Sequence, residues 1–122
     1  MTRRELIDYC LTYPGALEDY PFEDRNSTIL RHAANRKWFA LIFERNGTLC
    51  INLKCDPMEA DFLRQVFSAV TPAWHMSKVH WNTVALGGDV ADGELFDMIA
   101  SSFDLTKPHT KIADCSSLPK GV

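Results

Sequence analysis

The stretch RKWFALIFERNGTLCINLK, residues 36–54, contains the strongest structural signal in the sequence. Every position from 38 to 43 is apolar, which is typical of a strand that is covered on both faces and is therefore central in its sheet. Asn46-Gly47 supplies two residues that readily adopt the positive φ angles of a type I′ turn. Beyond the turn, leucine or isoleucine occupies every second position of TLCINLK. The stretch therefore predicts an antiparallel hairpin at the centre of a sheet.

Three segments have the apolar spacing and the capping residues of helices. The first is predicted over residues 3–13, after a T-x-x-E capping box. The second is predicted over residues 57–68, because Asp56-Pro57 combines an N-cap with a proline at the first helical position. The third is expected to follow Asp92 as its cap. The apolar face of the second helix is predicted to consist of Met58, Phe62, Leu63, Val66 and Phe67.

The remaining segments read as strands and loops. STILRHA, residues 27–33, is β-branched at its start and predicts a strand, and the acidic stretch over residues 17–24 predicts a loop before it. An extended segment is expected from 72 to 78, and HWNTVAL, residues 80–86, predicts a strand that ends at a glycine pair. The order of elements is thus α-β-β-β-α-β-β-α. This order predicts an α+β single domain, in which helices pack on one face of an antiparallel sheet.

The domain is expected to span residues 1–105, with residues 106–122 as a flexible C-terminal tail. Of the 122 residues, 46% are hydrophobic and 24% are charged, as in an ordinary soluble protein. The N-terminus lacks the apolar run of a signal peptide or membrane span, so a cytoplasmic protein without membrane contacts is expected. The cysteines are therefore expected to be reduced thiols; they are Cys10, Cys50, Cys55 and Cys115.

Charge is distributed unevenly along the chain, although the net charge is only -3. Residues 25–55 contain six basic residues and one acidic residue, and residues 62–88 contain two basic residues and no acidic one. Residues 89–105 contain five acidic residues and no basic one. A protein with this pattern is bipolar, and its basic part is able to attract a polyanion despite the net charge.

Three short motifs give the sequence a family resemblance. They are Leu53-Lys54 followed by Asp56-Pro57, the block His75-Met76-Ser77-Lys78 leading to His80-Trp81-Asn82-Thr83-Val84, and Ser102-Phe103-Asp104-Leu105. Together with the order of the predicted elements, these motifs show a resemblance to the MmcQ/YjbR family of small bacterial proteins. The resemblance covers residues 1 to about 105. The sequence departs from the family at Ser77, where asparagine is expected, and at Phe103, where tyrosine is common. The resemblance implies a frataxin-like fold, similar to CyaY, and a DNA-binding role through two hairpin wings. It implies no enzymatic activity and no defined substrate.

Known catalytic and metal motifs are not matched. Cys50-x4-Cys55 and His75-x4-His80 are too far apart for a zinc finger, and the second helix would lie inside such a site. Ser77 lacks a nucleophile elbow and a nearby carboxylate, and the glycine pair at 87–88 lacks the lysine of a phosphate loop. We therefore predict no catalytic residue, no metal and no cofactor. An iron-binding acidic surface, as in frataxin, stays an alternative; it would use Glu5, Asp8, Glu18, Asp19, Glu23 and Asp24.

Nucleic-acid binding has the best physical support among the functions considered. Cationic side chains on strands and turns neutralise phosphates and release counterions. Lys and Arg also keep a sheet soluble and discourage edge pairing, and this structural explanation of the basic residues stays open. The partner is expected to be DNA, with RNA as a further possibility. The candidate contacts are Arg31, Arg36, Lys37, Arg45, Lys54, Lys78, His80 and Asn82.

The stretch HMSKVHW, residues 75–81, is interpreted as mainly structural. Trp81 is expected to point into the core, while His80 and Asn82 are expected to share the polar side of their strand. The alternative function is a non-enzymatic protein-interaction or adaptor module that uses an exposed sheet face. An enzyme with an unrecognised pocket is a third alternative, and the sequence leaves the oligomeric state open.

Overall fold

The predicted hairpin is confirmed and occupies the middle of the sheet. In the computed structural model, which describes residues 1–108, β3 (Trp38–Arg45) pairs with β4 (Thr48–Lys54), from Ala40 opposite Leu53 to Arg45 opposite Thr48. The turn residues Asn46 and Gly47 have φ angles of 53° and 79°, as a type I′ turn requires. Alternate residues of β3 are buried on both faces of the sheet. The continuous apolar run of this strand is explained by this double burial.

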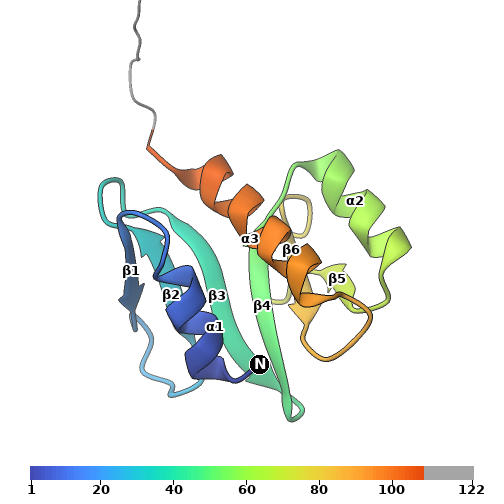
Figure 1. Ribbon diagram of the computed structural model, residues 1–122, viewed down its shortest axis with the longest axis horizontal. Coiled ribbons are helices and arrows are strands. Elements are labelled where there is room, and N and C mark those ends of the chain that lie inside the picture. Colours follow the sequence, from blue (N-terminus) through green and yellow to red (C-terminus); the bar gives the residue numbers. More distant parts are fainter. Residues whose placement is uncertain (109–122) are drawn as a thin grey trace, which may run out of the picture.

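The other strands are added on either side of the hairpin (Figure 1). The sheet has six strands in the order β1-β2-β3-β4-β6-β5, and every neighbouring pair is antiparallel. The predicted α+β class and the order of the predicted elements are confirmed. The outer strands are β1 (Ala16–Asp19), β2 (Thr28–His32), β5 (Val70–Pro72) and β6 (Trp81–Ala85).

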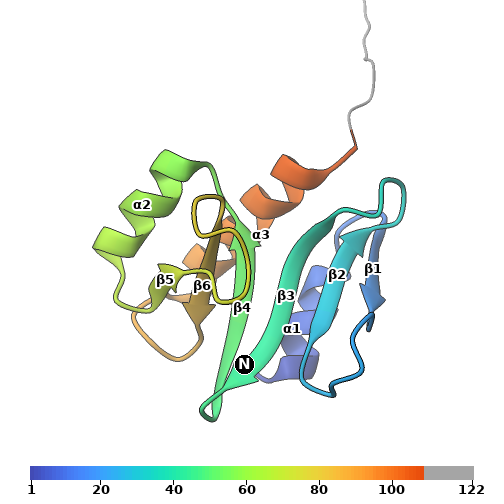
Figure 2. The same ribbon diagram turned by 180° about the vertical axis from the view of Figure 1, so that it is seen from behind.

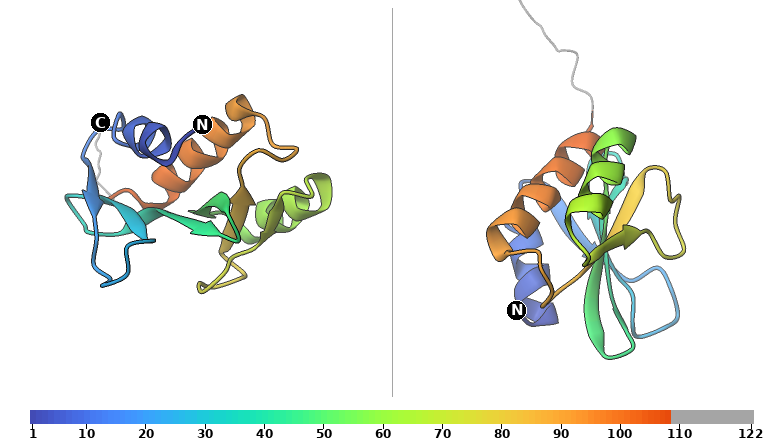
Figure 3. Two further views of the ribbon diagram at one scale, coloured as in Figure 1. Left: turned by 90° about the horizontal axis from the view of Figure 1, so that it is seen from below. Right: turned by 90° about the vertical axis from the view of Figure 1, so that its right-hand side faces the viewer.

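Helices and loops lie on opposite sides of the sheet (Figure 3). α1 (Arg3–Cys10) and α3 (Asp92–Thr106) cover one face, where Leu6, Ile42 and Ile99 belong to one buried cluster. α2 (Pro57–Val66) packs beside β5 and β6. On the other face, the connections 20–27 and 73–80 project from the sheet. We call this second side the loop face.

One predicted loop is in fact a strand. Residues 16–19 form β1, which pairs with β2 so that Leu17 lies opposite Arg31. Two ion pairs explain why a strand tolerates charged residues here. Asp19 binds Arg31 at 2.6 Å on the loop face, and Glu18 binds Arg4 of α1 at 3.0 Å on the other. Since both acidic residues are paired only through the tertiary structure, the local sequence resembled a solvated loop.

Several boundaries also differ from the prediction. α1 ends at Cys10 instead of residue 13, and α2 ends at Val66 instead of 68. The cap of α3 is Ala91, whose N–H donates to the Glu94 carboxylate, so Asp92 begins the helix instead of capping it. The expected extended segment at 72–78 is mostly loop.

α3 continues to Thr106, which is buried, so the domain extends past the predicted limit at residue 105. The part of the predicted tail from residue 109 onward lies outside the described residues. Within residues 1–108, no helix has both the length and the apolar character that crossing a membrane requires.

The apolar face predicted for α2 is wrong in part. Leu63 and Phe67 are half-buried beside the main core, but Met58, Phe62 and Val66 are 83%, 57% and 51% exposed. The residue of this helix that is fully buried is Ala60. Because α2 packs through a small side chain, its larger apolar residues form a stripe that faces solvent.

The positive φ angle of Gly47 in the turn of the central hairpin is testable by mutation. Replacing Gly47 by alanine forces a β-carbon into the left-handed region, which costs about 1–2 kcal/mol of unfolding free energy. Gly93 is a matched control, because it is helical and a β-carbon there meets no atom within 4 Å. Urea denaturation is expected to show Gly47→Ala destabilised and Gly93→Ala unchanged or stabilised. Equal stability of the two variants would contradict the turn assignment.

His32 gives a second test, through pH. It is 3% exposed beside Phe103, and its Nε2 lies 2.9 Å from the Thr106 hydroxyl, which itself donates to the Ser102 carbonyl. Burial lowers the pKa of His32 below its usual value. The unfolded chain therefore binds a proton more readily than the folded one, and the unfolding free energy falls as pH drops below about 6.5.

The corresponding measurement compares the unfolding free energies of the natural protein and of His32→Gln between pH 7 and 5. The natural protein is expected to lose more stability over this range, because glutamine does not titrate. Parallel pH profiles for the two proteins would show that His32 is not held neutral by the fold.

Candidate nucleic-acid interface

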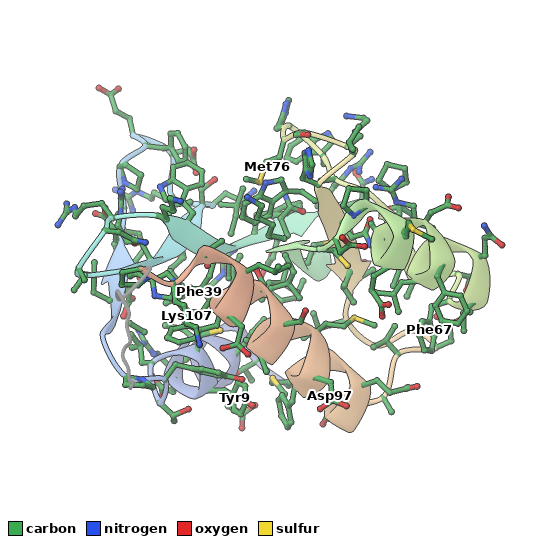
Figure 4. The ribbon with its side chains drawn as sticks, turned by 90° about the horizontal axis from the view of Figure 1, so that it is seen from above. Tyr9, Phe39, Phe67, Met76, Asp97 and Lys107 are labelled. Atoms are coloured by element: carbon green, nitrogen blue, oxygen red, sulfur yellow. The ribbon has the colours of Figure 1, made fainter. Side chains whose placement is uncertain are left out.

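The loop face is built on aromatic contacts. Ile29, Leu41, Phe43 and Cys50 form a second buried cluster on this side of the sheet, and Trp38 and Met76 pack against it. Figure 2 shows the loop 73–80 in front of β4 and β6, and Figure 4 places Met76 on the side of the sheet away from α3. The strands of this face are therefore largely covered by loops, and exposed apolar side chains on these loops include Phe22 and Trp74, which are 44% and 36% exposed. An interaction surface on this side would consist of loops instead of a bare sheet face.

Arg45 lies at one end of β3 on a stack of aromatic rings. Trp74 stacks on Phe43 with a centroid separation of 5.3 Å, and the Arg45 guanidinium lies 5.1 Å from the centre of the Trp74 ring. The φ angle of 65° at His75 turns the chain immediately after Trp74. Arg45 is exposed, so this stack presents a positioned guanidinium to solvent.

A second group of candidate contacts gathers at the other end of the sheet, which is the upper end in Figure 1. β3 begins there, β4 ends there at Lys54, and Lys54 pairs with Trp81 at the start of β6. Arg36 and Lys37 therefore lie at the same end as Lys54 and His80, although they are distant in sequence. Arg36, Lys37 and His80 are exposed and Lys54 is half-buried.

Arg31 is used within the fold. Its guanidinium binds Asp19 at 2.6 Å, donates to the Arg36 carbonyl at 3.1 Å and lies 5.9 Å from the centre of the Trp38 ring. Only 14% of its side chain is exposed. Arg31 therefore fixes the β2–β3 turn that carries Arg36 and Lys37, and it is a positioning residue more than a phosphate contact.

The prediction that Asn82 presents a polar surface is wrong. Asn82 is 3% exposed; its side chain accepts from Arg64 at 2.7 Å and donates to the Ala60 carbonyl at 3.2 Å. It joins α2 to β6 from the helix side of the sheet. His80 precedes the strand, so it does not share this buried position. Trp81 is half-buried on the other side, which agrees only partly with its expected place in the core.

Arg64 is a structural residue that sequence reasoning missed. Besides Asn82, it contacts the carbonyls of Lys78 and Trp81, so it holds the end of the loop 73–80 against α2. The Lys78 ammonium donates to the Ala73 carbonyl at 3.1 Å and closes the same loop. The stretch HMSKVHW is thus mainly structural, as interpreted, with Lys78 and His80 exposed. No sequence signal pairs Arg64 with Asn82, because 18 residues separate them.

Acidic residues lie mainly on the helices. α3 has Asp92, Glu94, Asp97 and Asp104, and all four are exposed. The one base near the end of this helix, Lys107, lies 3.6 Å from Asp104. α3 is on the opposite side of the sheet from the loop face, so its acids are separated from the basic turns of β3. The loop face is itself mixed in charge, because the connection 20–27 carries exposed Glu23 and Asp24.

The cysteine and histidine pairs do not converge. Cys50 belongs to the buried cluster under the loop face, whereas Cys55 lies at the β4–α2 junction and His75 contacts Trp74 with its ring tilted by 50°. Within the described residues, no three histidine, cysteine or acidic side chains lie close enough to hold a metal ion.

Together, the hairpin-centred antiparallel sheet, the helices on one face and the charged loop face define a small α+β protein with two chemically different sides. Residues 11–105 match the sequence model of the YjbR family. The chain therefore belongs to the YjbR family.

Curated relatives are similar over most of their length. The uncharacterized protein YyaQ of Bacillus subtilis is 35% identical over 118 residues, which cover 88% of this chain and 99% of YyaQ. The uncharacterized protein YjbR of Escherichia coli K12 is 34% identical over 103 residues, which cover 84% of this chain and 85% of YjbR.

Solved structures show the same fold. A crystal structure of a Pseudomonas syringae protein has a TM-score of 0.79 and 34% identity, and the similarity covers 88% of this chain and all of that one. A Deinococcus radiodurans protein has a TM-score of 0.77 and 30% identity, covering 85% of this chain and 77% of that one. The expected likeness to frataxin-like CyaY proteins stays a prediction.

Proposed function

We propose that this protein binds DNA by phosphate contacts from the basic turns at the two ends of β3. The observation that carries the proposal is the separation of charge: exposed cations lie at Arg36, Lys37 and Arg45, while the exposed acids of α3 lie behind the sheet. A local group of cations attracts a polyanion even when the net charge of the protein is negative. RNA is the alternative polyanion.

The separation of the two basic groups suits a nucleic-acid backbone. β3 has eight residues, so its ends are roughly 26 Å apart at about 3.3 Å per residue. Phosphates along one DNA strand follow one another at about 3.4 Å along the helix axis. The two groups would therefore span about 26 Å of the duplex, less than one helical turn of about 34 Å, which positions the duplex without reading its sequence.

The site is expected to bind with modest affinity and little base preference. Trp74 is 36% exposed, but its ring is held against Phe43 and the Arg45 guanidinium by the fold. Asn82 is buried and makes its hydrogen bonds internally. Binding through phosphate contacts weakens as the salt concentration rises, because each contact releases counterions. For about four phosphate contacts, the affinity is expected to fall about a hundredfold between 50 and 200 mM salt.

The test is fluorescence anisotropy of labelled double-stranded DNA, single-stranded DNA and RNA at those two salt concentrations. Lys37→Gln/Arg45→Gln is expected to weaken binding and to lower the salt slope by about two, because each lost phosphate contact removes nearly one released counterion. The matched control is Lys107→Glu, which lowers the net charge by the same two units on the helix side and leaves the basic turns intact.

The control is expected to bind like the natural protein, since the exposed ion pair Lys107–Asp104 contributes little to stability. Equal losses in the double variant and the control would mean that net charge alone governs binding. Absence of binding to all three nucleic acids at low salt would contradict the proposal.

The exposed stripe of α2 favours a second candidate, an interaction module that pairs with a second copy of itself. Met58, Phe62 and Val66 follow one another at four-residue intervals, so they lie along one line of the helix. Exposed apolar stripes of this kind are typical of protein contacts. Two antiparallel copies of α2 would place Phe62 against its own equivalent, as two-fold symmetry requires.

Sedimentation velocity over a concentration series tests this candidate. The natural protein is expected to dimerise, and Phe62→Gln is expected to stay monomeric because it interrupts the stripe at its centre. Leu105→Gln is the control, since Leu105 is also exposed but lies on α3. A natural protein that is monomeric throughout the series would rule the candidate out.

A further inference from the structure

A pocket lies between α2, α3 and the sheet, on the helix side of the molecule. Its volume is about 220 Å³. Figure 4 labels two of its lining residues, Phe67 just after α2 and Asp97 on α3. The polar contact between Asn82 and Arg64 fixes α2 to β6 beside this pocket, so its walls are held by the fold.

The inner wall of the pocket is apolar. It is formed by side chains from two strands, α2 and α3, which the core holds in place: Leu53, Leu63, Phe67, Val84 and Met98. Phe67 and Met98 offer an aromatic ring and a thioether, which are favourable neighbours for an aromatic ligand. This wall suits an apolar group of a small molecule.

The rim of the pocket is acidic. Glu59 from α2 and Glu94 and Asp97 from α3 line it, and Lys54 is the one base among its lining residues. Glu94 accepts from the Ala91 N–H, while Glu59 and Asp97 form no ion pair within residues 1–108. Three carboxylates and one ammonium leave a net negative rim, which favours a cation.

The remaining polar groups do not oppose a cation. Burial raises the pKa of the Cys55 thiol to about 11, so this lining residue is neutral at pH 7. Asn82 makes its hydrogen bonds to α2, and Ser101 adds a hydroxyl near the exposed side of α3. An apolar wall with a few polar groups that fix orientation is the usual construction of a small-molecule site.

We propose that this pocket binds a small primary amine that carries an aromatic group. The ring would occupy the wall between Phe67 and Met98, and the ammonium would lie at the rim between Glu59 and Asp97. The volume equals that of roughly seven water molecules at about 30 Å³ each, which limits the ligand to a single ring with a short chain. An arylalkylamine fits both the size and the charge.

This inference is independent of the proposed nucleic-acid function. The pocket lies on the helix side of the sheet, and its acidic rim would repel phosphates. Lys54 is shared by the pocket lining and the candidate nucleic-acid contacts, so the test leaves it unchanged.

Methyl NMR titrations with three related compounds test the proposal. Phenethylamine is expected to give saturable shifts at the methyl groups of Leu63, Val84 and Met98. Phenethyl alcohol has the same ring without the charge, and phenylacetate reverses the charge; both are expected to bind more weakly. Equal responses to amine and alcohol, or no saturable response to the amine, would overturn the assignment.

Two double variants distinguish an effect of the acidic rim on amine binding from an effect of the protein's net charge. Glu59→Gln/Asp97→Asn removes one carboxylate from each helix at the pocket, and Asp61→Asn/Asp104→Asn removes one from each helix outside it. The first is expected to weaken amine binding roughly three- to tenfold, because partly exposed ion pairs are individually weak, and to leave alcohol binding unchanged. The second is expected to bind like the natural protein. Equal effects of the two variants would contradict a role for the rim.

An acetylated and amidated lysine is titrated alongside, as a mimic of a side chain from a partner protein. Pocket shifts with this mimic and none with phenethylamine would assign the pocket to a partner's lysine and would overturn the small-amine proposal.

Discussion

The antiparallel pairing of β3 with β4 is the constraint on which the other elements depend. β2 and β6 add to its two sides, and the apolar residues of β3 on both faces require cover. α1 and α3 cover one face, and the aromatic residues of the loop face cover the other. Because the middle of the sheet is closed on both sides, charged groups are placed at the strand ends, in the turns and on the outer surfaces of the helices.

This placement explains how one small domain has two sides of different chemistry. At the strand ends, Arg36, Lys37 and Arg45 are held by a β2–β3 turn and an aromatic stack that are themselves structural. On the helix side, α3 contributes acids to a pocket with an apolar wall. The ion pair between Arg31 and Asp19 belongs to the first side, where it supports the turn without being an exposed contact.

The sequence predicted what depends on local pattern. The hairpin followed from Asn46-Gly47 between alternating apolar residues, and the start of α2 followed from Asp56-Pro57. β1 and the burial of Asn82 were not predictable, because each depends on a partner that is distant in the chain. The exposure of Phe62 was not predictable either, because it follows from the packing of α2 through Ala60. β1 requires Arg4 and Arg31, and Asn82 requires Arg64. The positions of Arg36-Lys37 and Arg45 at opposite ends of β3 followed from the hairpin itself, but the placement of Lys54 and His80 at the same end as Arg36-Lys37 required the strand pairing.

The most direct test of the account is an amide NMR titration of the protein with a short DNA duplex, which reports every contacted backbone position at once. The account predicts shifts at the β2–β3 turn, at the β3–β4 turn and in the loop 73–80, with the amides of α3 unchanged. Shifts that concentrate on α2 or α3, or that are absent from the two turns of β3, would contradict the assignment of the basic side as the binding surface.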